Sequence, residues 1–251
     1  MRKNLAAALF ILLISPFECR RIDQAEAFLK VTSRTGELIR VRPEYEERYI
    51  IIHKHTFPGV LSRIYKSNMR NYTIFLRDGI LFAHHEYVGT DPATDAAAIK
   101  ADPVTQEWWK LTDPMQEPLE NRKPGEWWAS MEELLHIDAR QMDYRQVHHF
   151  AFTAEILPDQ ESPFRQVIAD NHELLTRLAE PLHTQNLSLF IKERTVYVYF
   201  EYYGEDEQAD LQALIQNKSF EPIMKQISGI MCHPLENQPC WQPMREVFHT
   251  N

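Results

Sequence analysis

A small group of side chains in the first half of the sequence has the residue types and spacing of a site for a polar ligand. Tyr49 and His53 are four positions apart, so on a helix they would lie on one face. Histidine is the side chain best suited to giving and taking a proton near neutral pH. Tyr72 adds a second hydroxyl, and Trp108 and Trp109 add flat apolar walls that each carry an indole N–H. Such walls suit the C–H faces of a sugar or of another flat polar molecule.

The same residues also have a purely structural interpretation. A Tyr-x-x-x-His pair on a helix packs more often than it catalyses, and a Trp-Trp pair near a helix end usually belongs to a core or an interface. An internal repeat in the sequence helps to separate the two interpretations. The matching pieces, at a nearly constant separation, are Pro43 and Pro158, residues 81–87 and 196–202, and residues 131–136 and 244–249. We therefore predict a tandem duplication.

The second half of the repeat lacks the candidate site. At the positions equivalent to Tyr49, His53, Tyr72 and the Trp pair, it has Phe164, Ile168, Leu187, Met224 and Lys225. The joint loss of polar and indole side chains favours a site that the first half kept and a second half that became scaffold. Glu86 and Glu201 occupy equivalent positions in both halves, so we interpret them as structural, although Glu86 could also orient His53.

Each half has the same order of secondary-structure signals. In the first half, strands are expected at 38–41, 72–76 and 80–88 and helical stretches at 44–66 and 93–110, with a tight turn at Arg77-Asp78-Gly79. In the second half, strands are expected at 150–156, 187–191 and 195–203 and helical stretches at 160–182 and 208–227. A terminal strand follows in both halves. His84 and His85 would point to opposite faces of their strand, and we assign them no role.

The order β-α-β-β-α-β defines a ferredoxin-like unit, an antiparallel sheet with both helices on one face. Two such units can cover each other's open sheet face. We therefore predict an α+β fold in which two ferredoxin-like βαββαβ repeats form a pseudo-dimeric α+β barrel. The predicted organisation is a leader and linker at 1–35, a first repeat with the active site at 36–138, and a degenerate second repeat at 146–251.

Composition and the first residues limit the function classes and the compartment. The formal charge of −9, without a dense Lys/Arg cluster, argues against nucleic acid and against an anionic membrane surface. Arg2 and Lys3 precede a short apolar run, which is typical of a signal peptide and predicts a periplasmic or secreted protein. A wrongly assigned start codon would instead leave the protein in the cytoplasm. Cys232 and Cys240 could bridge in an exported protein, or stay as separate thiols.

Residues 36–138 resemble the L-rhamnose mutarotase family, and residues 146–251 resemble it in framework only. The matching pattern is Pro43, Tyr49-x-x-x-His53, Pro58, Asn71-Tyr72, residues 81–83 with Glu86, Trp108-Trp109-Lys110 and Met131-x-Glu133. The resemblance implies an isomerase that interconverts the α and β anomers of a deoxyhexose, L-rhamnose or L-fucose, without a cofactor or a metal. It also implies that His53 is the general acid and that Tyr49, Tyr72, Trp108 and Trp109 line the sugar site.

Two other classes of protein fit the same sequence. A non-catalytic carbohydrate-binding or sensing protein would keep the aromatic pocket without turnover. A dimeric-barrel oxygenase or cofactor-binding relative would share the fold but not the Tyr/His/Trp-Trp set, because a fold does not by itself define a function.

Overall fold

The computed structural model describes residues 30–138, 140, 147–231 and 240–251. Most of the expected leader and Cys232 lie outside these residues, so export stays a prediction and both alternatives for Cys232 and Cys240, a bridge or two separate thiols, stay untested. No helix in the described part of the chain is long and apolar enough to cross a membrane.

Two successive segments of the chain have the same order of elements. The first contains β1 (Ser33–Val41), η1 (Pro43–Tyr45), α2 (Glu46–His53), α3 (Pro58–Lys66), β2 (Met69–Arg77), β3 (Ile80–Tyr87), α4 (Pro92–Ala101), α5 (Pro103–Thr112), η2 (Asp113–Met115), β4 (Gln116–Glu117), β5 (Ala129–Ser130) and β6 (Glu132–Ile137). The second contains β7 (His148–Glu155), α6 (Glu161–Asp170), α7 (His172–Ala179), η4 (Glu180–Leu182), β8 (Thr184–Lys192), β9 (Thr195–Tyr202), α8 (Glu207–Ile215), α9 (Glu221–Ile230) and β10 (Gln242–Thr250).

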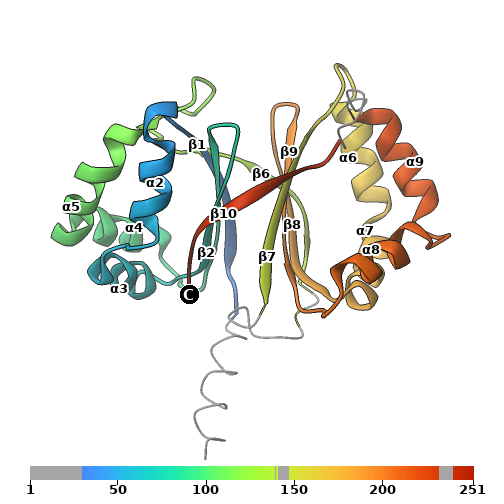
Figure 1. Cartoon of the computed structure of the whole chain (residues 1–251), viewed down its shortest axis with the longest axis horizontal. Helices are drawn as coiled ribbons and strands as arrows, with labels where there is room; N and C mark the ends of the chain where they lie inside the picture. The colour runs from blue at the N-terminus through green and yellow to red at the C-terminus, as the bar shows by residue number, and fades with distance from the viewer. Residues whose placement is uncertain (1–29, 139, 141–146, 232–239) are drawn as a thin grey trace, which may run out of the picture. The chain divides into compact units, whose positions relative to one another are not determined.

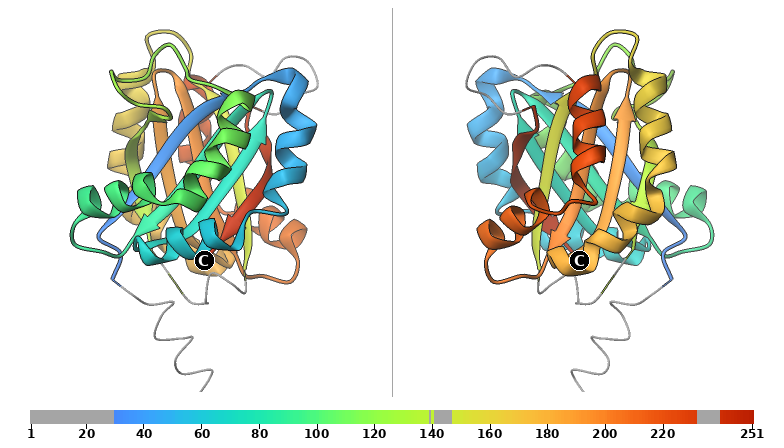
Figure 2. Two further views of the ribbon diagram at one scale, coloured as in Figure 1. Left: turned by 90° about the vertical axis from the view of Figure 1, so that its left-hand side faces the viewer. Right: turned by 90° about the vertical axis from the view of Figure 1, so that its right-hand side faces the viewer.

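The strands form one curled antiparallel sheet in the order β4-β1-β3-β2-β10-β7-β9-β8-β6. The helices lie on its outer face, α2 to α5 over the strands of the first segment and α6 to α9 over those of the second (Figures 1 and 2). The segment 129–137 pairs with β1 through β5 and with β8 through β6, so it links the two ends of the sheet.

Each segment gives its last strand to the other. β6 pairs with β8, and β10 pairs first with β7 and then with β2. Figure 1 shows β10 crossing from one set of strands to the other. This exchange brings residues at the end of the chain against the helices of the first segment.

The predicted long helices are wrong in extent, because each is divided in two. Pro58 begins α3, and the preceding Phe57 has an extended ψ of 129°, as the residue before a proline favours. Pro103 begins α5, where the Asp102 carboxylate accepts a hydrogen bond of 2.8 Å from the Thr105 N–H and caps the helix. In the second segment, Asn171 separates α6 from α7 and residues 216–220 separate α8 from α9.

The predicted turn between β2 and β3 is present. Asp78 and Gly79 both have positive φ, 48° and 75°, as the two central residues of a type I′ hairpin turn require. The hairpin fixes the register of the two strands, so that Leu76 lies opposite Leu81. Alternation along β3 then places His84 inside the curled sheet, stacked on Tyr199, and His85 on the outer face against Tyr72.

A bulge in β2 aims one candidate site residue. The pairing of β2 with β3 shifts between Arg70 and Thr73, and Asn71 within this shift has a φ of 50°. The Asn71 side chain lies inside the curled sheet and donates a hydrogen bond of 2.7 Å to Glu201. The next residue, Tyr72, lies on the outer face, where the helices pack. A bulge is a common device for re-aiming a side chain beside a functional site.

Asn71→Ala is expected to destabilise the protein by about 2–4 kcal/mol, from the strain of Ala at positive φ and the loss of a buried bond to a charged acceptor. Urea unfolding would measure the loss. Asn71→Gly loses the same side-chain hydrogen bond but avoids the strain, so it should recover about 1 kcal/mol of the loss. A stability of Asn71→Ala within about 0.5 kcal/mol of wild type would contradict this account of the bulge.

Glu86 has a partner other than His53. The Glu86 carboxylate lies inside the curled sheet and accepts a hydrogen bond of 2.7 Å from the Arg140 guanidinium. The His53 ring lies on the other side of the sheet, among the helices. The suggestion that Glu86 orients His53 is therefore wrong, whereas its structural interpretation fits the ion pair.

Candidate active site

A pocket of about 420 Å³ lies between the outer face of the first set of strands and the helices α2, α3 and α5. All the predicted site residues line it: Tyr49, His53, Tyr72, Trp108 and Trp109. The structure thus brings together side chains from two helices and one strand that are far apart in the sequence.

His53 is held in one orientation and one tautomer. Its ring stacks on Tyr49 with ring centroids 3.9 Å apart. The rings of Trp108 and Phe248 lie in T-shaped contact with it, with centroids 5.2 and 5.8 Å away. Nδ1 lies 2.8 Å from the Tyr49 carbonyl oxygen, which can only accept, so Nδ1 carries the proton. Burial lowers the His53 pKa to about 4, against a weaker opposing effect of that hydrogen bond. At neutral pH the ring is neutral and its Nε2 is a proton acceptor.

The two tyrosines keep their hydroxyl protons. Burial raises the pKa of Tyr49 well above its usual value, and burial together with the nearby Glu37 carboxylate raises the pKa of Tyr72. Each hydroxyl can therefore donate a hydrogen bond to a sugar oxygen. The Tyr72 ring is fixed by edge contacts with Phe248 at 5.6 Å and His85 at 5.5 Å.

Trp108 and Trp109 come from α5. Trp108 is buried and contacts His53 and Phe57 edge-on, each at 5.2 Å between ring centroids, and Trp109 is half-buried beside it. Together they form an apolar wall next to the imidazole, an arrangement suited to the C–H face of a sugar ring.

The sequence interpretation missed several residues of the pocket. Glu37, Gln116, Trp127, Trp128 and Phe248 also line it, as does Asp113. One signal was available: Glu126-Trp127-Trp128 repeats the letters of Glu107-Trp108-Trp109. Nothing local marks Phe248, since it reaches the pocket only through the exchange of β10.

Gln116 connects two of the walls. Its side-chain oxygen accepts a hydrogen bond of 3.0 Å from the Trp127 indole N–H, and its amide N–H₂ lies 3.4 Å from the Tyr49 hydroxyl. Trp127 is 46% exposed, so it extends the aromatic wall toward the mouth of the pocket. The loop that carries the second Trp pair is thereby tied to the helix that carries His53.

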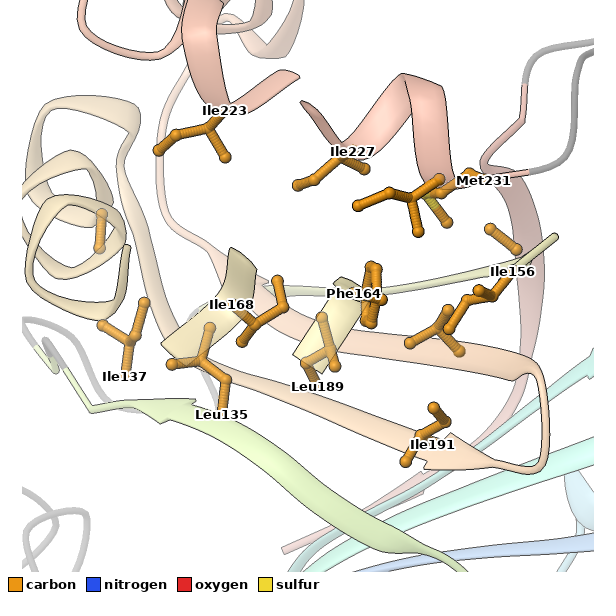
Figure 3. Packing of buried hydrophobic residues seen from close by; sticks show 14 residues of the cluster. Leu135, Ile137, Ile156, Phe164, Ile168, Leu189, Ile191, Ile223, Ile227 and Met231 are labelled. Atoms are coloured by element: carbon orange, nitrogen blue, oxygen red, sulfur yellow. The ribbon is translucent and has the colours of Figure 1, made fainter. Parts of the chain in front are cut away.

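The corresponding region of the second segment is filled. Phe164 and Ile168 on α6 pack against Ile223 and Ile227 on α9 and against Leu135 of the exchanged β6 (Figure 3). Within the described residues, the side chains that fill this space are apolar and none of them is an acid–base group.

The predicted equivalence of the Trp pair with Met224 and Lys225 is wrong. Met224 is half-buried and Lys225 is exposed, and isoleucines form the buried face of α9. The reason lies in the connection: residues 216–220 separate α8 from α9, whereas Asp102 alone separates α4 from α5. The longer connection changes which residues of α9 face the sheet.

A larger cavity, of about 1010 Å³, opens at the hairpin end of the curled sheet. It is lined by charged residues of both signs, such as Arg40, Glu117, Glu155 and Lys192, and by none of the predicted site residues. We therefore take the smaller pocket, which contains all the predicted site residues, as the candidate active site. In the described part of the chain, no group of three or more His, Cys, Asp and Glu side chains is arranged to hold a metal ion.

Phe248→Leu is expected to weaken sugar binding several-fold with a loss of stability below about 1.5 kcal/mol, because the substitution keeps most of the volume but removes two ring contacts. Titration with sugar would measure the affinity, and thermal unfolding the stability. Met244→Leu is the matched control, since Met244 is on the same strand and lines the other cavity. Equal affinities of the two variants would argue that β10 contributes nothing to binding.

The fold and the pocket define a class of protein: a curled antiparallel sheet flanked by helices, with one aromatic pocket around a neutral histidine. Residues 34–137 match the family model described as L-rhamnose mutarotase. The predicted resemblance to this family is confirmed over these residues. The family implies an isomerase that acts on sugars.

Solved structures with similar folds span nearly the whole chain. A protein from Lactobacillus acidophilus NCFM, named as a candidate monooxygenase, matches with a TM-score of 0.53 and 5% identity, covering 87% of this chain and 96% of its own. Another protein with such a name, from Fusobacterium nucleatum subsp. nucleatum ATCC 25586, matches with a TM-score of 0.51 and 12% identity, covering 87% and 93%. At these identities the likeness concerns the fold alone. No curated protein sequence matches this chain.

Proposed function

We propose that this protein is an aldose mutarotase that interconverts the α and β anomers of a deoxyhexose, L-rhamnose or L-fucose, in the pocket around His53. The observation that carries the proposal is the neutral His53 ring, whose Nδ1 proton is committed to the Tyr49 carbonyl. Nε2 then remains as a proton acceptor inside a pocket with aromatic walls. The family of residues 34–137 supports the same reaction.

Mutarotation needs one proton removed and one delivered. Nε2 of His53 takes the proton of the anomeric hydroxyl, the bond between C1 and the ring oxygen breaks, and the ring oxygen receives a proton from a hydroxyl or carboxyl donor of the pocket, to which that proton later returns. The aldehyde then rotates about the C1–C2 bond. The ring oxygen loses its proton as it attacks the other face of C1, and His53 returns its own proton to O1. Because His53 begins as the neutral base, it acts as an acid only in the second half of the cycle.

We also infer that the two segments arose by tandem duplication and form an intramolecular pseudo-dimer. Supporting this inference are the repeated element order and the reciprocal exchange of β6 and β10. The second segment then supplies scaffold, together with the strand that carries Phe248. No cofactor or metal is required by the reaction, and the expected ligand is a monosaccharide.

Saturation-transfer NMR on the anomeric protons tests the proposal. We expect the wild-type protein to accelerate α–β exchange of L-rhamnose or L-fucose above the spontaneous rate, and comparison of the two sugars gives the preference. Binding of either sugar without faster exchange would favour a carbohydrate-binding or sensing protein. Well-folded protein that neither binds nor accelerates these sugars would rule out the proposed substrates.

A further inference from the structure

In the described part of the chain, Glu37 is a carboxyl group without a partner in the wall of the pocket. On β1, Leu38 points inside the curled sheet, whereas Glu37 and Ile39 are on the outer face, where the pocket lies. Within the described residues, the Glu37 carboxyl makes no hydrogen bond and no ion pair. A half-buried carboxyl normally finds a donor in the protein, so this one is free to meet a ligand.

The surroundings of Glu37 favour the protonated acid. Glu126, in the loop before β5, disfavours the ionised form of Glu37 by charge repulsion. None of the described residues that line the pocket is a Lys or an Arg that could offset this repulsion. The other titratable groups on this face are Tyr72 on β2, His85 on β3, Tyr49 and His53 on α2, and Asp113 in η2. Burial keeps both histidines neutral, each with a pKa of about 4, so neither supplies a positive charge. Burial and Glu126 raise the pKa of Glu37 to about 7.

We propose that Glu37 is the second proton-transfer residue of the site, a general acid that protonates the ring oxygen while His53 accepts the proton of the anomeric hydroxyl. This inference rests on the proposed mutarotase function. The two groups come from different walls, β1 and α2, so a sugar between them meets a donor on one side and an acceptor on the other. Two titratable groups with pKa values pushed in opposite directions are typical of an acid–base pair.

The cycle balances without any further reactant. Glu37 gives its proton to the ring oxygen as the bond from C1 to that oxygen breaks and the C1–O1 double bond forms, with the O1 proton on Nε2 of His53. After rotation about C1–C2, the Glu37 carboxylate takes the proton back as the ring oxygen attacks C1. His53 then reprotonates O1. Both residues end in their starting states, and the product is the opposite anomer.

The pH dependence of catalysed exchange tests the role of Glu37. In the wild type, exchange above the spontaneous rate should fall as the pH rises through about 7, where Glu37 loses its proton. Glu37→Gln should lower the rate by on the order of 10²-fold and abolish this alkaline limb. Glu37→Asp keeps a carboxyl group, so it should keep part of the catalysed exchange rate and still show a fall of that rate at alkaline pH. Glu126→Gln removes the repulsion, so it should move the limb to lower pH at a similar maximal rate.

Thermal unfolding distinguishes this role from a structural one. The pKa of Glu37 is about 7 in the folded protein against about 4.5 without burial. Ionisation of Glu37 therefore destabilises the folded protein. The stabilising contribution of the protonated form is fully present below pH 4.5 and is lost as the pH rises through about 7. Glu37→Gln should melt higher than wild type at pH 8 and close to it at pH 4. A carboxylate that holds the fold together would give the opposite change at pH 8.

The outcomes separate this inference from the function on which it rests. Wild-type protein without any catalysed exchange would overturn the mutarotase proposal itself. An active wild type whose rate and alkaline limb survive Glu37→Gln would overturn the role of Glu37 and leave the mutarotase in place. A higher KM for Glu37→Gln with an unchanged limb would also overturn it, because that result describes a residue that only binds the sugar.

Discussion

Replacing His53 should reduce catalysed anomer exchange by on the order of 10³-fold while leaving sugar affinity within a few-fold of wild type. In the proposed mechanism, the aromatic walls and the tyrosine hydroxyls would supply most of the contacts to the sugar, whereas the imidazole would supply the proton transfer. His53→Gln is the gentler substitution, since it keeps volume against Tyr49 and Trp108. His53→Ala leaves a space beside Trp108, where added imidazole should restore part of the rate.

His55 provides the matched control for His53. It is an exposed histidine two positions further on, outside the pocket, so His55→Gln should exchange the anomers at the wild-type rate. Saturation-transfer NMR gives the rates, and titration with the sugar gives the affinities. A His53→Gln variant that kept more than about a tenth of the wild-type rate would exclude the imidazole as the main proton-transfer group.

The decrease of the catalysed exchange rate at low pH should also depend on His53. Burial lowers the His53 pKa to about 4, so the base form persists down to that pH, and catalysed exchange should fall only as the pH drops through about 4. The same shift affects stability. The His53 ring is neutral in the folded protein, whereas the unfolded chain protonates it near pH 6.5. The free energy of unfolding should therefore decrease as the pH falls from about 6.5 to 4.

Glu201→Ala should destabilise the protein by about 3–5 kcal/mol, the largest stability effect that we expect. The Glu201 carboxylate is fully buried inside the curled sheet. It accepts hydrogen bonds of 2.7 Å from Asn71, 2.7 Å from Gln185 and 2.6 Å from Asn186. The Tyr199 hydroxyl lies 3.1 Å from the same group. Removing the carboxylate leaves several buried donors without an acceptor.

Urea unfolding of Glu201→Ala, Glu201→Gln and Glu47→Ala measures this effect. Gln at position 201 keeps one acceptor oxygen, but its amide N–H₂ would face the donors that bind Glu201 in the wild type. We therefore expect an intermediate loss of stability. Glu47 is exposed on α2, and its replacement should change stability by no more than about 0.5 kcal/mol. Equal stabilities of Glu201→Ala and Glu47→Ala would show that the network contributes little.

Glu201 also connects the second segment to the pocket. Its bond to Asn71 crosses from β9 to the bulge of β2, and the bulge places Tyr72 in the pocket. Glu201→Ala should therefore raise the KM for the sugar in the fraction of protein that stays folded. The second segment, although its own interior is filled, would in this way hold a residue of the site in place.

Much of the site could be predicted from the sequence because its signals are local or repeated. The spacing of Tyr49 and His53 places them on one helical face, and the Arg77-Asp78-Gly79 turn fixes the hairpin beside Tyr72. Ile168 at the position that the predicted repeat makes equivalent to His53 indicated that the candidate site lies in the first half. These inferences need only helical periodicity, turn geometry and a comparison of the chain with itself.

Other parts of the site depend on contacts between residues distant in the chain, and only the tertiary structure decides them. Phe248 enters the pocket because β10 pairs with β2, a choice between strands that no local pattern encodes. The protonation states of His53 and Glu37 follow from desolvation, which depends on what the fold packs around each group. The sequence by itself determined which side chains were available for chemistry, whereas the tertiary structure decided which of them meet and which proton each one holds.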